Sequence, residues 1–110
     1  MITVVETRRF ALDAETLFSE ESLAQLVTYL AFSPEAGDVI QGTGGFRKLR
    51  WASSGRGKRG GARVIYFYWV GSYVVLTRAY AKNVKIDLTT EEKRALRQVA
   101  STLKGEKGNG

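Results

Sequence analysis

The chain has 110 residues, 44% of them hydrophobic, and a formal net charge of +6. This length allows one domain with a buried core and excludes two. The absence of cysteine and histidine excludes disulfides, thiolate metal sites and histidine-based catalysis, so we expect neither a metal nor a cofactor. No apolar run reaches the roughly 18 residues of a membrane span, and no signal peptide is evident. We therefore expect a cytoplasmic protein with a single domain over residues 1–104 and a flexible tail over residues 105–110.

Residues 39–85 form a basic stretch that contains ten lysines and arginines and no acidic residue. Glycines and aromatic residues are interleaved with these cations, a pattern typical of a polyanion-binding surface built on a β-sheet. Residues 1–38 have the opposite balance, with seven acidic residues against two basic ones. Nucleic acid is therefore the leading partner class, and an anionic membrane surface is the second.

The first third of the chain predicts a strand followed by two helices. Residues 2–6 are mainly β-branched, which favours a strand, and residues 10–18 fit a short helix. Ser19 is a typical N-cap for a second helix, whose apolar stripe follows helical spacing at Leu23, Leu26, Val27 and Leu30. Pro34 ends this helix.

The basic stretch predicts the strands of the sheet. Residues 39–40 form a potential extended piece, and a strand follows at 46–51. Residues 62–70 are rich in β-branched and aromatic side chains and form the strongest strand, with which residues 73–80 pair back. The dipeptide Gly71-Ser72 between these two strands fits a two-residue type II′ turn.

A final helix begins at Thr89, which can form a capping box with Glu92. The resulting order, β-α-α-β-β-β-α, predicts an α+β domain. We expect a small antiparallel sheet with two N-terminal helices and one C-terminal helix.

Strand alternation places candidate binding residues on one face of the first basic strand. Lys48 and Arg50 point to one side, whereas Arg47 points to the other side with Leu49 and Trp51. If the apolar pair packs inward, Lys48 and Arg50 lie side by side on the exposed face.

Further residues point to a bound phosphate or base. Arg63 and Arg78 lie in otherwise apolar strands, so each needs a carboxylate from a helix or a ligand phosphate, and we favour the phosphate. Tyr80 shares the face of Arg78 and is the best candidate for stacking on an unpaired base. The string GTGG at 42–45 lacks the lysine of a phosphate-binding loop, so we interpret it as a turn. The loop at 55–61 can wrap a phosphate backbone with its cations Arg56, Lys58 and Arg59.

Three sequence strings resemble a known protein family: GDVIQGTGGFRKLRW at 37–51, GKRGGARVIYFY at 57–68 and YAKN at 80–83. They are similar to the RelE/ParE superfamily of bacterial toxins, specifically the HigB-like branch of type II toxin–antitoxin modules, and the resemblance extends over essentially the whole chain. It implies an α+β fold related to microbial ribonucleases and metal-independent cleavage of mRNA in the ribosomal A site. It also implies a cognate antitoxin protein as partner, and we expect no membrane partner.

The resemblance carries roles onto individual residues. The paired strand lysines of RelE-type toxins resemble Lys48 and Arg50, and the arginine that opens the next strand resembles Arg63. The catalytic tyrosine near the C-terminus of the RelE prototype has no match, because Leu88 falls near it, so Tyr80 is the candidate for its stacking role. The implied catalytic set is Lys48, Arg50, Arg63 and Lys82. The predicted RNA-binding set, from the residues and the resemblance together, is Arg47, Arg56, Lys58, Arg59, Arg78, Tyr80 and Asn83.

The expected reaction is attack of a 2′-hydroxyl on the adjacent phosphate, which leaves a 2′,3′-cyclic phosphate. Arg50 and Arg63 would hold the phosphate as negative charge develops on it, and Lys48 or Lys82 would transfer protons. The residues alone leave open which of the two is the base. Two alternatives also stay open: a ParE-like toxin that inhibits DNA gyrase by protein contact, and a non-catalytic basic RNA-binding module.

Overall fold

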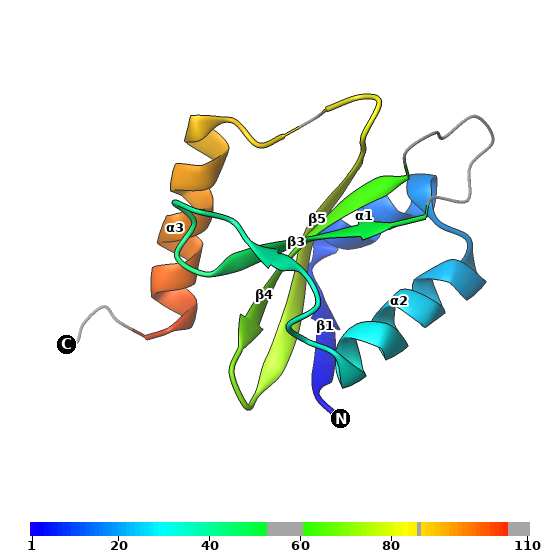
Figure 1. Ribbon diagram of the computed structural model, residues 1–110, viewed down its shortest axis with the longest axis horizontal. Helices are drawn as coiled ribbons and strands as arrows, with labels where there is room; N and C mark the ends of the chain where they lie inside the picture. Colours follow the sequence, from blue (N-terminus) through cyan, green and yellow to red (C-terminus); the bar gives the residue numbers. More distant parts are fainter. Residues whose placement is uncertain (53–60, 86, 106–110) are drawn as a thin grey trace.

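The computed structural model describes residues 1–52, 61–85 and 87–105. Its strands are β1 (Thr3–Glu6), β2 (Asp38–Val39), β3 (Phe46–Trp51), β4 (Ala62–Trp69) and β5 (Tyr73–Ala81). Its helices are α1 (Arg8–Leu17) and α2 (Glu20–Phe32), which follow β1, and α3 (Thr90–Leu103), which follows β5. This arrangement confirms the predicted α+β class (Figure 1). Within the described ranges, no helix has the length and apolar content needed to cross a membrane.

The five strands form one sheet in the order β1-β5-β4-β3-β2. Strands β2 to β5 pair antiparallel, as predicted, whereas β1 pairs with β5 in parallel. The expectation of a purely antiparallel sheet is therefore wrong at this edge. After β1 the chain passes through α1 and α2 and enters the sheet at the opposite edge, and three successive reversals then leave β5 running in the direction of β1.

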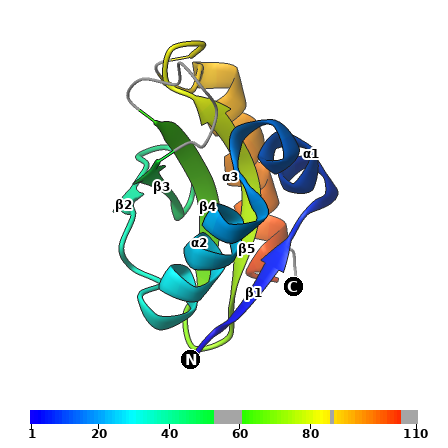
Figure 2. The ribbon, with the colours of Figure 1, turned by 90° about the vertical axis from the view of Figure 1, so that its right-hand side faces the viewer.

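Two apolar clusters cover the two faces of the sheet. On one face, α1 and α2 pack on β4 and β5 through residues that include Phe10, Leu30 and Tyr66. On the other face, α3 packs on β3 and β4, and Phe46 and Ala100 are buried there. Figures 1 and 2 show α3 on the side of the sheet opposite to α2. On these strands Arg50 of β3 is exposed, whereas every residue of β5 is at least partly buried.

Side-chain caps fix where the helices begin. The hydroxyl of Ser19 accepts the amide of Ser22 at the start of α2, and Thr89 and Glu92 form the predicted capping box of α3. The first helix begins at Arg8, two residues earlier than predicted, because the Thr7 side chain accepts the Phe10 amide and acts as its N-cap.

The β4–β5 connection differs from the predicted two-residue turn. It spans residues 70–72, and the Ser72 amide donates to the Trp69 carbonyl at 2.9 Å. Gly71 has a φ of 78° and occupies the third position of this turn, where type II turns require a positive φ. Glycine is therefore needed here, but at a different turn position from the one that the type II′ prediction gave it.

Candidate functional site

Strand register gathers the predicted cations into adjacent rows on one face of the sheet. Arg50 on β3 lies opposite Arg63 on β4, and Arg63 lies opposite Tyr80 on β5. Residues paired in this way project to the same face of an antiparallel sheet. In the neighbouring row, Lys48 lies opposite Ile65. Lys48, Arg50 and Arg63 therefore occupy one face, which we call the cationic face.

The two arginines of the cationic face have different environments. Arg50 is exposed and makes no ion pair within the described residues. Arg63 is 7% exposed, and its Nη1 donates to the Ala62 carbonyl at 3.4 Å. Its guanidinium thus adds positive charge from beneath the surface, whereas that of Arg50 extends into solvent. Both remain candidates for holding a phosphate.

Asp87 places a carboxylate beside the cationic face. Its Oδ1 lies 3.4 Å from Lys48 Nζ and also accepts the Leu88 amide at 2.8 Å. The Leu88 amide, together with the Lys48 ammonium, lowers the pKa of Asp87 below its usual value. Sequence reasoning missed this residue. The available signal was its position, since it is the first acidic residue after the basic stretch.

The segment after β5 brings a further cation to the start of β4. Lys82 donates its backbone amide to the Gly61 carbonyl at 3.1 Å, two residues before Arg63. The side chains of Lys82 and Asn83 are exposed, and Lys82 forms no ion pair in the part of the chain that the structure describes. Both predicted residues therefore lie near the end of the sheet that carries Arg63.

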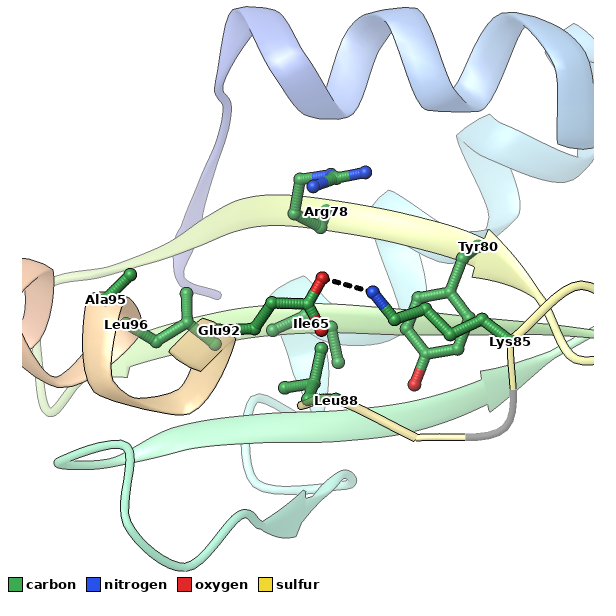
Figure 3. A pocket seen from close by; sticks show the side chains of 8 residues that line it. All are labelled: Ile65, Arg78, Tyr80, Lys85, Leu88, Glu92, Ala95 and Leu96. Carbon is green, nitrogen blue, oxygen red and sulfur yellow. Dashed lines mark hydrogen bonds and ion pairs between the residues drawn. The ribbon is translucent and has the colours of Figure 1, made fainter. Parts of the chain in front are cut away.

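A cavity of about 160 Å³ lies between the sheet and α3 (Figure 3). An ion pair between Lys85 and Glu92 spans it, and the Lys85 ammonium lies 5.7 Å from the centre of the Tyr80 ring. The hydrogen bond from Lys85, followed by that from the Thr89 amide, lowers the pKa of Glu92. Lys85 thus lies over the ring of Tyr80, and Glu92 pairs with its ammonium group.

Tyr80 is not the exposed stacking platform that the sequence predicted. It is 9% exposed and belongs to the apolar cluster under α3. Its buried hydroxyl has no hydrogen-bond partner among the described residues. Burial raises the pKa of this hydroxyl, with smaller contributions from Asp87 and Glu92. The prediction was wrong because strand alternation assigns a face to a side chain and says nothing of what covers that face.

Arg78 and Arg47 each have intramolecular partners. Arg78 Nε lies 2.9 Å from the Asp13 carboxylate of α1, which is the helix-carboxylate partner that the sequence analysis gave as the alternative, and its contact with a phosphate stays a prediction. Arg47 Nη1 donates to the carbonyls of Glu35 and Gly37, at 3.2 and 2.8 Å. It lies on the face opposite Lys48 and holds the segment before β2.

The remaining predictions concern two loops and the C-terminal tail. Residues 42–45 are a turn, as predicted, in which the buried Thr43 hydroxyl donates to the Ile40 carbonyl at 2.7 Å and accepts the Phe46 amide at 3.1 Å. The predicted tail beyond Gly105 lies outside the described residues, and so do three predicted RNA-binding cations: Arg56, Lys58 and Arg59.

These features define a small α+β protein with a cationic sheet face. A family model described as the RelE toxin of the RelE/RelB toxin–antitoxin system matches residues 4–109. The chain belongs to this family of toxins. Its expected partner is accordingly a cognate antitoxin.

Proposed function

We propose that the protein is a HigB-like toxin that cleaves mRNA on the translating ribosome. The single observation that supports this most directly is the register of β3 and β4, which sets Arg50 directly opposite Arg63 with Lys48 in the next row. Three cations on one rigid sheet face can hold one phosphate and the groups that react at it.

The proposed reaction is attack of a ribose 2′-hydroxyl on the neighbouring phosphate. The P–O5′ bond breaks, a 2′,3′-cyclic phosphate forms, and the 5′-oxygen of the next nucleotide takes up a proton. Negative charge increases on the non-bridging oxygens in the transition state. Arg50 supplies the exposed guanidinium to bind them, and the buried charge of Arg63 strengthens the positive potential at the same point.

The ion pairs suggest how the two lysines divide the proton transfers. Lys48 is paired with the Asp87 carboxylate at 3.4 Å, and this contact holds its side chain in place. We therefore assign Lys48 as the donor to the leaving 5′-oxygen. Lys82 has no carboxylate partner in the described ranges and is the candidate to accept the 2′-hydroxyl proton.

The proposed dependence on the ribosome rests on how few proton-transfer groups the chain offers. The chain has no histidine, the side chain best suited to proton transfer near neutral pH. A substrate that is already held in the reactive geometry can compensate, because orientation alone contributes several kcal/mol to lowering a barrier. The ribosomal A site would provide that orientation.

The test is to express the protein in translating bacteria and map the 5′ ends of mRNA. Cuts in phase with codons are expected for the wild type, together with growth arrest. Both should be lost in Arg50→Gln and Lys48→Met and retained in the control Arg8→Gln, which removes an exposed cation from α1. Growth arrest that persists in the first two variants, with broken DNA and no mRNA cuts, would sink the proposal in favour of ParE-like inhibition of gyrase.

A further inference from the structure

A second group of cations lies on α3, outside the cationic face. Arg94, Arg97 and Lys104 line a groove of about 530 Å³ together with Gln98 and Ser101. Arg94 and Arg97 lie on α3 and Lys104 is its C-cap residue, so the three cations form one stripe about 15 Å long. No carboxylate lines the groove among residues of known placement.

The loop before β3 forms the other wall of this groove. Gly44 has a φ of 78°, and a Cβ atom at this position would lie 3.0 Å from Ala100 Cβ and 3.5 Å from Arg97 Cγ. The loop backbone therefore lies directly against α3, as Figure 1 shows. Gly44 and the cation-bearing side of α3 therefore face each other across the groove.

Aromatic side chains continue the groove toward the β4–β5 connection. A neighbouring hollow of about 240 Å³ is lined by Tyr68, Trp69, Val70 and Lys104, so Lys104 belongs to both depressions. Trp69 is half-buried, and its ring lies 5.8 Å from that of Tyr73. Its indole therefore packs against Tyr73 and stays partly exposed.

This surface is separate from the cationic face. Trp69 lies six residues along β4 from Arg63, which corresponds to about 20 Å. One nucleotide cannot contact both places. The α3 groove therefore has its own ligand or its own part of a long one.

We propose that the α3 groove and Trp69 form a second RNA-binding surface. Arg94, Arg97 and Lys104 bind backbone phosphates, and an unpaired base stacks on Trp69. Cations along a channel that leads to an anchored aromatic ring are the combination that binds single-stranded nucleic acid, because phosphates and bases are engaged at once. An acidic protein segment would use the cations and leave the indole without a matching partner. The proposal concerns binding and stands whether or not the chain cleaves RNA.

The test measures binding of a short single-stranded 2′-O-methyl RNA, which cannot undergo attack by a 2′-hydroxyl. Fluorescence anisotropy over a range of salt concentrations compares wild type with Arg94→Gln/Arg97→Gln. The control Arg8→Gln/Arg9→Gln removes the same charge from exposed positions on α1. The groove variant should bind about tenfold more weakly, and its slope of log K against log salt should fall by about 1.4, since each lost phosphate contact contributes roughly 0.7. The control should resemble wild type.

Trp69→Leu separates stacking from charge. It should weaken binding about fivefold or more without changing the salt slope, because stacking releases no counterions. The same fold-changes in RNA affinity are expected in an Arg50→Gln background, so the result does not depend on the cleavage site. Equal affinity and slope for the groove variant and the α1 control would overturn the proposal. So would a groove variant that loses its antitoxin while it still binds the RNA normally.

Discussion

The carboxylate of Asp13 on α1 accepts a hydrogen bond from Arg78 Nε on β5 at 2.9 Å. The same oxygen accepts the backbone amide of Ala79, also at 2.9 Å. Strand β1 pairs with β5 only as far as Leu76, so the rest of this edge of β5 has no neighbouring strand. A helix side chain thus completes the hydrogen bonding of the sheet where β1 stops.

Asp13→Ala should destabilise the protein by about 2 kcal/mol, because it leaves the Ala79 amide and the Arg78 guanidinium without an acceptor. Arg78→Met should cost less, since Asp13 still accepts from Ala79. Urea unfolding followed by circular dichroism measures both. Equal losses in the two variants would show that the ion pair, and not the strand-edge amide, provides the stabilisation.

Tyr66→Phe and Tyr80→Phe remove the same atom and should have opposite outcomes. The Tyr66 hydroxyl accepts the Gly37 amide and donates to the Pro34 carbonyl, both at 2.8 Å, so its removal should cost about 2 kcal/mol. The Tyr80 hydroxyl is buried with no partner in the described structure, so its removal should be neutral or stabilising by up to about 1 kcal/mol. Each variant is the control for the other in thermal unfolding. A comparable loss in both would contradict the prediction.

Stability should fall as the pH rises above the usual tyrosine value of about 10. Burial raises the pKa of Tyr80 and of Tyr66 in the folded protein. An unfolded chain releases these protons at a lower pH, so the stabilisation is present below about pH 10 and is lost as the pH increases through the folded-state values. The Tm of Tyr80→Phe should decline less steeply between about pH 9 and pH 11 than that of wild type. Identical slopes would show that Tyr80 contributes nothing to alkaline unfolding.

Asp87→Asn should slow mRNA cleavage by roughly tenfold while leaving the fold intact, because Lys48 loses the carboxylate that orients it. Single-turnover cleavage on ribosome complexes measures the change. Glu91→Gln is a matched control, since Glu91 is an exposed carboxylate in the first turn of α3. A larger effect of Glu91→Gln than of Asp87→Asn would indicate a general electrostatic effect in place of a specific contact.

Local chemistry made much of the fold predictable from sequence. The caps at Ser19 and Thr89 satisfy amides within three residues, so they can be identified without knowledge of the fold. Side-chain alternation also placed Lys48 and Arg50 on one face correctly, because that pattern belongs to the strand itself. These features depend on neighbours in the chain.

Long-range relationships could not be predicted in the same way. The register that sets Arg50 opposite Arg63 depends on the connection between β3 and β4, and the partner of Arg78 lies 65 residues away on α1. The burial of Tyr80 depends on Lys85 and α3, which cover it from the C-terminal part of the chain. Alternation assigns a face, but only tertiary packing decides whether that face is open.

The parallel pairing of β1 with β5 has a consequence for synthesis of the protein. Thr3 lies opposite Tyr73, so the partners are separated by 70 residues of sequence. Contacts between residues so far apart in the sequence form late, because a long loop must close before they contribute to stability. A nascent chain therefore cannot complete its sheet until β5 has left the exit tunnel. By then Lys48, Arg50 and Arg63 have all been made, so the strands that carry the cationic face are synthesised before the sheet can be completed.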